Sequence, residues 1–314
     1  MGIVTIALLL LAPILFNATG IVDTFLTKLF RKEQDDGVLQ SSISTLMIIG
    51  GIIALVVALV ILPFVYPIMG DLSVYMTAMV VICGVVYGLA AYPYFHALYH
   101  ERIENIIPIL QTIPLFSYFF AITLLGEQIS GLQLGLMIAI IIVTGLFSWD
   151  FTTKKLNWKG MLWTMGSSLL YGLFYVLFKY GGGENVNIWL AFFWEHVGVA
   201  LGCLVFAIPS KARRTTMRYL GAHGWKFGLL NLSNELFFIV GVMIVNYLTL
   251  SQPVAIVNTL TNGVQPIVGF GMIFAAYRLR PKIFDREYRG KILLYKMILC
   301  VVSLALLGRF FHIT

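Results

Sequence analysis

The chain has 314 residues, of which 60% are hydrophobic and only 11% are charged, and its formal net charge is +7. An average soluble domain has about 25% charged residues, so water cannot be the only solvent of this protein. Long apolar segments use up almost the whole chain, which excludes a separate soluble catalytic domain. We therefore expect a single transmembrane domain over residues 1–314.

Ten apolar segments follow one another along the chain. A helix needs about 20 mostly apolar residues to cross a bilayer, and its backbone groups must pair within the helix because lipid offers no partner. The sequence thus predicts an all-α integral membrane protein with ten transmembrane helices, and basic loops near 209–225 and 277–291. The predicted spans are 3–27, 41–65, 73–98, 106–125, 132–149, 160–180, 187–208, 226–249, 254–276 and 291–311.

The basic residues alternate between the intervals that separate these spans. Of the 21 Lys and Arg residues, all but Lys179 and Arg309 lie in or beside odd-numbered intervals. Lys and Arg are retained on the cytoplasmic side, so both termini are expected outside the cytoplasm and the chain in the cytoplasmic (inner) membrane of a bacterium. The basic residues are spread over five intervals with few aromatic residues among them, which favours the lipid bilayer over a nucleic acid as partner.

An internal repeat is suggested by Gln111 with Pro114 in the fourth span and Gln265 with Pro266 in the ninth. We predict two five-helix repeats, residues 1–152 and 153–314. Because five is odd, the second repeat must cross the membrane with opposite polarity. This inverted-repeat design is common in secondary transporters.

Two carboxylates lie near the middle of predicted spans, Glu195 in the seventh and Glu235 in the eighth. An ionisable side chain in lipid costs about 2.5–3.5 kcal/mol on insertion scales, so it usually faces a cavity or a partner. Glu195 shares a helical face with Gly198 and Gly202, and small residues let helices approach closely. Both acids are predicted to exchange a proton or bind a cation; the alternative is a neutral glutamate that joins two helices.

Polar residues of the ninth span are candidates for substrate binding. Asn258, Asn262 and Gln265 share one face just before Pro266, and proline interrupts a helix as in many transporter sites. The alternative is that these amides only join neighbouring helices.

The first and eighth spans add three further polar candidates. Asn17 lies near the centre of the first span, and Asn231 lies one turn before the acid of the eighth. Asp23 is a candidate gate charge that binds a proton or a cation, although Lys28 nearby also allows a simple ion pair.

Tyr171 and Tyr175, four residues apart in the sixth span, can offer ring faces to a cation. Substrates that carry phosphate would be expected to require a basic residue in the cavity, yet no Lys or Arg lies near the centre of a predicted span. Carboxylates and aromatic faces together favour a cationic or zwitterionic substrate.

The sequence contains no motif for other chemistry. It has no His-Glu-x-x-His, no Gly-x-Ser-x-Gly, no phosphate-binding Gly-x-x-x-x-Gly-Lys and no Cys/His metal spacing. We therefore expect neither an enzyme nor a metal or other cofactor, and ATP-driven pumping is disfavoured.

Two segments carry short motifs. The first, 97–148, includes Pro108 to Pro114, Leu125-Gly126-Glu127, Gly135 and Gly145; the second includes Asn234-Glu235, Gln252 to Ala255 and Gln265-Pro266. These segments resemble the repeat signature of EamA-type carriers of the drug/metabolite transporter superfamily. The resemblance implies ten helices in two inverted five-helix repeats, a central cavity, and export or import of small metabolites. Members of that family are usually drawn with both termini in the cytoplasm, so either this chain is inverted or the span count differs by one.

These observations favour a secondary transporter that moves a small metabolite, an amino acid or an organic cation, by alternating access with proton coupling at Glu195 or Glu235. One alternative is a membrane-embedded enzyme or lipid-handling protein that acts on a long-chain substrate, but the sequence shows no nucleophile–base pair. Another is a passive channel, for which polar faces on more helices would be expected. The oligomeric state is left open.

Overall fold

The computed structural model describes residues 3–31, 36–101, 103–148, 158–183, 186–279 and 291–313, and helices dominate every one of these ranges. No strand occurs in these ranges, which confirms the all-α class. The predicted repeat boundary at residue 152, most of the predicted loop 277–291, and the basic residues Lys32, Arg102, Lys154 and Lys155 lie outside the described residues. The α-helices are α1 (Ile3–Arg31), α2 (Asp36–Val65), α3 (Val74–His100), α4 (Ile103–Leu110), α5 (Ile113–Leu125), α6 (Gly131–Ser148), α7 (Trp158–Gly182), α8 (Ile188–Leu204), α9 (Ser210–Ser251), α10 (Val254–Leu279) and α11 (Lys291–Ile313).

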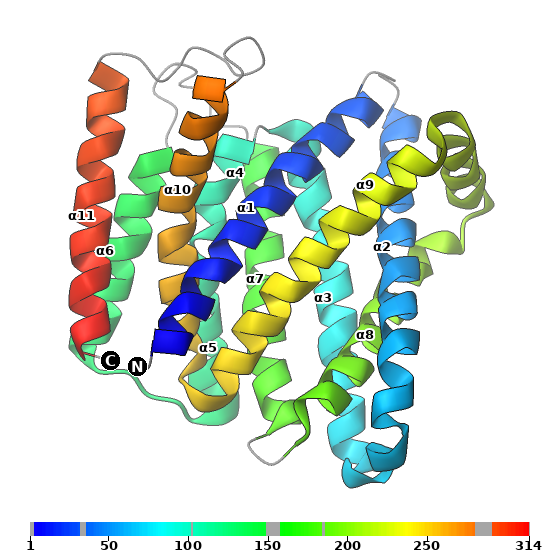
Figure 1. Cartoon of the computed structure of the whole chain (residues 1–314), viewed down its shortest axis with the longest axis horizontal. Coiled ribbons are helices and arrows are strands. Elements are labelled where there is room, and N and C mark those ends of the chain that lie inside the picture. Colours follow the sequence, from blue (N-terminus) through cyan, green and yellow to red (C-terminus); the bar gives the residue numbers. More distant parts are fainter. Residues whose placement is uncertain are drawn as a thin grey trace.

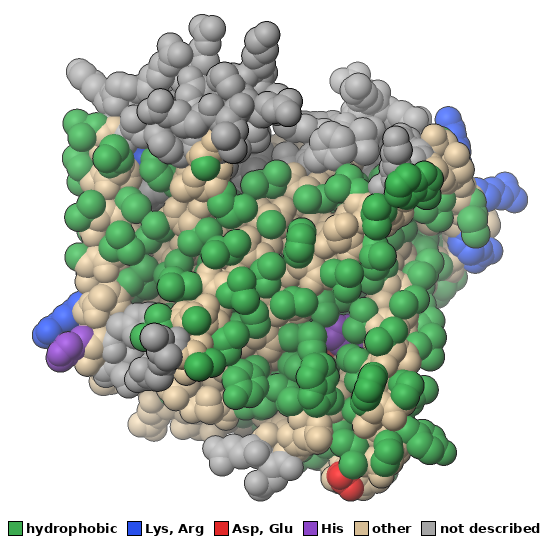
Figure 2. All heavy atoms as spheres, viewed as in Figure 1, with side chains coloured by type: hydrophobic (Ala, Val, Ile, Leu, Met, Phe, Trp, Pro, Cys, Tyr) green, Lys and Arg blue, Asp and Glu red, His purple; other side chains and the backbone are tan. Residues whose placement is uncertain are grey.

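The protein is a multi-pass membrane protein. Six helical stretches of the described chain are long and apolar enough to cross a bilayer, and two shorter apolar helices, Ile113–Leu125 and Gly131–Leu146, accompany them. Hydrophobic side chains cover most of the face seen in Figure 2. The six stretches are Val4–Asp23, Ile43–Asp71, Val74–His100, Trp158–Gly182, Ile188–Ala207 and Phe227–Ser251.

The fourth predicted span, 106–125, is not one helix. It is divided into α4 and α5 at Gln111 and Thr112, which form a turn between them. Pro114 lies in the first turn of α5 and has no N–H, so it cannot continue the hydrogen-bond ladder of α4. Thr112 closes the turn, because its N–H and its hydroxyl both donate to the Ile109 carbonyl, at 3.0 and 2.6 Å. The described residues therefore contain eleven α-helices, where ten were predicted for the chain.

The prediction of a basic loop near 209–225 is also wrong, because residues 210–223 are helical. This helix continues into the eighth predicted span through a bend at Gly224, whose φ of 62° and ψ of −161° suit glycine. The sequence suggested a loop here because many basic residues interrupt the apolar pattern that marks the membrane helices. The bend separates a short basic helix from the long apolar stretch Phe227–Ser251.

The helices form one bundle in which α3, α7 and α8 are central neighbours. α3 packs against α7 and α8, α2 against α8 and α9, and α1 against α9 and α10. On the other side α5 packs against α7 and α10, and α6 against α11 (Figure 1). The chain runs back and forth, so the N-terminus of α1 and the C-terminus of α11 lie at the same end of the bundle in Figure 1. We call this the terminal end and the other the basic end.

The small residues on the Glu195 face of α8 allow a very close approach to α3. A Cβ on Gly198 would overlap the Val81 backbone oxygen, and one on Gly84 would overlap that of Glu195. The expected close packing of this face is confirmed, and it fixes α8 against the centre of the bundle.

Candidate functional site

A cavity of about 110 Å³ lies in the middle of the bundle, between residues of α1–α5 and α7–α10. A single water needs roughly 10–15 Å³ on this scale, so the cavity has room for several waters or for a small ligand. Seven of the ten predicted site residues line it. The lining residues with a polar or titratable group are Thr19, Asp23, Tyr87, Tyr94, Tyr171, Tyr175, Glu195, His196, Cys203, Asn234, Glu235, Asn262 and Gln265.

Asp23 is the most firmly held of the three acids. Asn234 Nδ2 of α9 donates to Asp23 Oδ1 at 2.7 Å, and the Tyr94 hydroxyl of α3 donates to Asp23 Oδ2 at 3.1 Å. The side chain is buried, with 4% of the residue exposed. Both of its oxygens thus accept hydrogen bonds, and the carboxylate joins α1, α3 and α9 beside the cavity.

Glu195 is even more deeply buried, with 1% of the residue exposed. Asn246 Nδ2 of α9 donates to its Oε2 at 3.2 Å. The residue also lines the cavity, so one side of the carboxylate meets α9 while the open space lies alongside. This position suits an acid that can bind a ligand and also be held by a neighbouring helix.

Glu235 differs from the other two acids because it makes no hydrogen bond or ion pair to a described residue. It follows Asn234 on α9 and lines the same cavity. Its Oε1 lies close to Gly50 of α2, where a Cβ would be only 3.2 Å away. The absence of a side chain at residue 50 therefore leaves room for this carboxylate, whose bonding capacity remains available to a ligand.

Aromatic rings form one wall of the cavity. The Tyr87 ring stacks on Phe238 with 5.8 Å between centroids, and it meets Tyr171 edge to face at 6.0 Å. Tyr175 also lines the cavity. Tyr171 and Tyr175 were predicted, whereas Tyr87 and Phe238 were not, because nothing in the sequence distinguishes them from the many aromatic residues that pack in lipid.

His196 is a cavity residue that the sequence did not indicate. Its Nδ1 lies 2.7 Å from the Phe192 carbonyl of the preceding helical turn. A carbonyl only accepts, so Nδ1 carries the proton and Nε2 is an acceptor when the ring is neutral. The helical spacing of Phe192 and His196 is ordinary, and although His196 follows Glu195 in the sequence, only the fold shows that both side chains line the cavity.

The amides of α10 divide into two groups. Asn262 and Gln265 line the cavity, as predicted, whereas Asn258 is buried away from it and its side-chain atoms lack a hydrogen-bond partner in the described part of the chain. Pro266 follows Gln265 within α10. α10 is helical from Val254 to Leu279, so the expected interruption of this helix at Pro266 is not observed, although its polar face does reach the cavity.

Asn17 and Asn231 do not line the cavity. Asn17 Nδ2 donates to the Pro13 carbonyl of its own helix and to the Gln265 carbonyl of α10, both at 2.8 Å. Asn231 Nδ2 donates to the Phe227 carbonyl of its own helix at 2.8 Å. Both side chains thus satisfy backbone carbonyls in this structure, and Asn17, predicted to bind substrate, instead joins α1 to α10.

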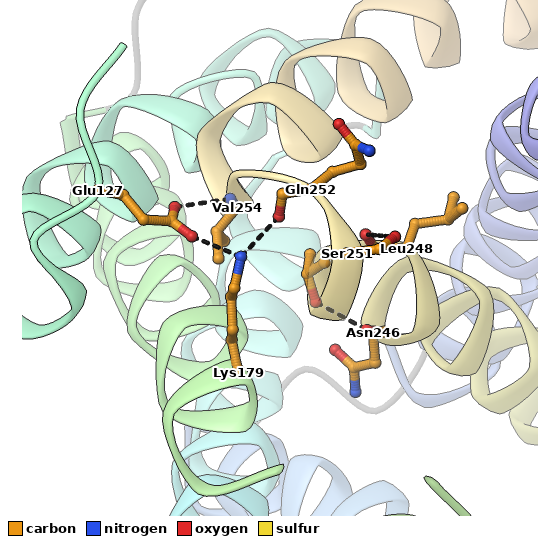
Figure 3. Close-up of polar contacts among 8 residues, drawn as sticks. Glu127, Lys179, Asn246, Leu248, Ser251, Gln252 and Val254 are labelled. Atoms are coloured by element: carbon orange, nitrogen blue, oxygen red, sulfur yellow. Dashed lines mark hydrogen bonds and ion pairs between the residues drawn. The ribbon is translucent and has the colours of Figure 1, made fainter. Parts of the chain in front are cut away.

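A second polar cluster lies at the terminal end of the bundle and was not predicted (Figure 3). Lys179 Nζ of α7 lies 2.6 Å from Glu127 Oε1, in the connection between α5 and α6. Lys179 also donates to the Gln252 carbonyl at 2.8 Å, and Glu127 Oε2 accepts from the Val254 N–H at 2.9 Å. We call these four residues the latch, because they join the connection after α5 to the junction between α9 and α10.

Comparisons with known proteins support the fold alone. No family model matches the chain, and no curated protein matches it. A solved structure described only as "Crystal structure of protein" is similar to this chain, with a TM-score of 0.53 at 14% identity over 94% of this chain and 95% of that one. The fold thus recurs in a protein of similar length that has little sequence identity with this chain.

Proposed function

We propose that this chain is an EamA-type secondary carrier that moves a small cationic or zwitterionic metabolite, an amino acid or an organic cation, across the cytoplasmic membrane. The observation that carries the proposal is the lining of the central cavity. Asp23, Glu195 and Glu235 converge there, and no described lining residue is Lys or Arg. Carboxylates beside aromatic faces attract a positive charge in a site with little water.

The packing of the helices supports two repeats related by a pseudo-twofold axis. If α4 and α5 together count as one helix, then α1, α2, α3, α4–α5 and α6 of the first repeat correspond to α7, α8, α9, α10 and α11 of the second. The contact of α3 with α7 then corresponds to that of α9 with α1, and the contact of α3 with α8 corresponds to that of α9 with α2. Likewise the pair α4–α5 meets α7 as α10 meets α1. These three pairs of contacts are equivalent when each helix is matched with the helix five positions along the chain, which is the arrangement expected of inverted repeats.

A pair of hydrogen bonds follows the same relation. Asn17, in the first helix of one half, donates to the carbonyl four residues earlier and to Gln265 in the fourth helix of the other half, both at 2.8 Å. Ser168, in the first helix of the second half, donates to the Thr164 carbonyl at 3.0 Å and to the Ile109 carbonyl of α4 at 3.3 Å. The first helix of each half therefore donates a hydrogen bond to the fourth helix of the other half.

The transport cycle that we propose is alternating access around this cavity. The two repeats rock against each other, and the latch holds them together at the terminal end in the state described here. Glu235 has no hydrogen bond to a described residue, so it is the acid best placed to bind a proton or the substrate ammonium group. Under this proposal the basic end faces the cytoplasm and both termini lie outside it.

Ligand binding is the first test. The purified protein in detergent is screened by thermal unfolding against amino acids, polyamines, quaternary amines and nucleosides, because a ligand that binds the folded state raises its stability. We expect stabilisation by a cationic or zwitterionic compound, and a weaker effect in Glu195→Gln and Glu235→Gln. Asp71→Asn is the matched control, since Asp71 is an exposed carboxylate that does not line the cavity. Stabilisation that the two Gln variants retain in full would overturn the assignment of the cavity.

Transport is the second test. Proteoliposomes that contain the wild-type chain should accumulate the identified ligand when a proton gradient is applied, and Glu235→Gln should lose the dependence on the gradient. Asp71→Asn should behave as the wild type. Gradient-driven accumulation by Glu235→Gln at the wild-type rate would exclude this acid from proton coupling.

A further inference from the structure

The short basic helix before the bend in α9, residues 210–223, has an exposed face that the proposed transport function does not use. It lies beside the bundle near the basic end, where Figure 2 shows Lys and Arg side chains gathered at one edge. No acidic residue occurs between Ile208 and Asn234. The basic helix therefore presents a compact, positively charged face, and it is joined directly to a membrane-spanning helix.

The opposite face of this helix is held by the bundle. Ala212, Thr216 and Tyr219 are buried and lie on one side of the helix by their spacing. The Thr216 hydroxyl donates to Thr45 of α2 at 3.3 Å and to the Ala212 carbonyl at 2.9 Å. The helix thus has a fixed rotation, which decides which side chains point away from the protein.

The outward face combines basic and apolar residues. Lys211, Arg214 and Arg218 are exposed, and none of them makes a hydrogen bond or ion pair to a described residue. Met217, between the basic residues, is 72% exposed, and Trp225, just after the bend, is 73% exposed. A helix with apolar side chains flanked by Lys and Arg lies at the boundary between headgroups and acyl chains, and Trp favours the same boundary.

Arg213 is different from its neighbours. It donates to the carbonyls of Ala207 and Ile208, both at 2.8 Å, and so satisfies the chain that leads into the helix. Its guanidinium group is therefore bound by backbone carbonyls of the protein itself. Among the described side chains of this face, Lys211, Arg214 and Arg218 are the cations that form no hydrogen bond or ion pair to a described residue.

We propose that the face formed by Lys211, Arg214, Met217, Arg218 and Trp225 binds the phosphate groups of anionic membrane lipids, with Met217 and Trp225 inserted beside the acyl chains. This binding fixes the basic helix to the membrane surface and is independent of the substrate cavity. Each basic residue near an anionic membrane surface strengthens binding by about fivefold at low ionic strength.

The test uses the full-length protein in neutral detergent, titrated with phosphatidylglycerol at low salt, with thermal unfolding and native mass spectrometry as readouts. The triple variant Lys211→Gln, Arg214→Gln, Arg218→Gln is expected to bind phosphatidylglycerol roughly 100-fold more weakly than the wild type. Arg309→Gln, which removes a charge from α11, is the control and should bind as the wild type. The charge-conserving variant Arg214→Lys, Arg218→Lys should also retain binding.

Several ligands separate a lipid surface from other polyanions. Phosphatidylcholine, soluble glycerol phosphate and a short DNA duplex are titrated in parallel, and only phosphatidylglycerol is expected to produce the effect. Equal binding of phosphatidylcholine, an unchanged response in the triple variant, or binding of DNA or glycerol phosphate that the triple variant loses would overturn the proposal. The charge-conserving variant keeps the test valid if the triple variant does not fold.

Discussion

Lys179 and Glu127 form an ion pair in which each partner also satisfies the end of another helix. The amine of Lys179 lies 2.6 Å from the carboxylate of Glu127. It also donates to the backbone carbonyl of Gln252, the residue that directly follows α9. The carboxylate accepts from the N–H of Val254, the first residue of α10. A negative side chain at a helix N-terminus is favourable, so the pair fixes both sides of the α9–α10 junction.

The first prediction concerns the energy of this pair. Glu127→Gln and Lys179→Met should each lower the free energy of unfolding by about 1–2 kcal/mol, because hydrogen bonds to charged groups contribute more than neutral ones. The double variant should lose less than the sum of the two, by about 1 kcal/mol, since one interaction is removed in both singles. Unfolding in detergent with denaturant measures all three. Strict additivity would show that the two side chains act independently.

The second prediction concerns access to the cavity. The sequence has three cysteines, Cys83, Cys203 and Cys300, and Cys203 lines the cavity. After Cys83→Ala and Cys300→Ser, a membrane-impermeant maleimide reports the exposure of Cys203. We expect Lys179→Met to speed its labelling from the terminal end, because the latch no longer holds that end together.

The control for this labelling experiment is Arg309→Gln, which removes a basic residue without touching the latch. It should label at the rate of the parent. Equal labelling rates in Lys179→Met and the parent would mean that the latch does not restrict access from the terminal end.

The sequence indicates the all-helical membrane class and the acids within apolar segments because both are local signals. Hydropathy over some 20 residues indicates a membrane helix, and a carboxylate in such a segment stands out. Glu195 and Glu235 are therefore evident from the amino-acid sequence itself. The break between α4 and α5 was not predicted, because α4 and α5 are both apolar and together read as one span.

The partners of these acids could not be predicted, because they depend on contacts between distant segments. Asn234 and Tyr94 hold Asp23 across 211 and 71 residues of sequence. An asparagine in an apolar helix equally suits a bond to its own backbone, as Asn231 shows. The partners of Lys179 could not be predicted for the same reason. Lys179 lies outside the charge pattern of the sequence, and its contacts in the latch are to Glu127 and Gln252, which are distant in the sequence.

The third prediction separates a structural acid from a ligand-binding one. Asp23→Asn replaces one acceptor oxygen by an N–H₂ group, so Asn234 and Tyr94 can no longer donate to separate oxygens of this side chain, and the change should cost about 1–3 kcal/mol of stability. Glu235→Gln should change the stability by less than about 0.5 kcal/mol, because Glu235 has no hydrogen bond to lose within the described chain, yet it should weaken ligand binding. Thermal unfolding with and without ligand measures both effects. A larger loss of stability in Glu235→Gln than in Asp23→Asn would reverse the two roles.

The fourth prediction concerns pH. Protonation removes the negative charge of the cavity acids, so the affinity for a cationic ligand should fall as the pH is lowered. In the double variant Glu195→Gln, Glu235→Gln the dependence should flatten, because only Asp23 remains to titrate among the three acids. Calorimetric titration of the ligand at several pH values measures this. A profile identical to that of the wild type would place the titrating group elsewhere.

The fifth prediction tests whether the close contact of α3 and α8 positions Glu195. Gly84→Ala would place a methyl group on backbone atoms of Glu195 and Val199, and these cannot move aside as a flexible side chain would. The helices must separate, at a cost of about 1–3 kcal/mol, and the carboxylate moves with α8, so ligand affinity should fall as well. Gly135→Ala in α6 is the matched control, because no atom lies within 4 Å of its added methyl group. Alanine is the better helix former, so this control should be neutral or stabilising by up to ~1 kcal/mol, with unchanged ligand affinity. If Gly84→Ala lowers stability but leaves the affinity intact, the α3–α8 contact supports the fold without setting the position of the acid.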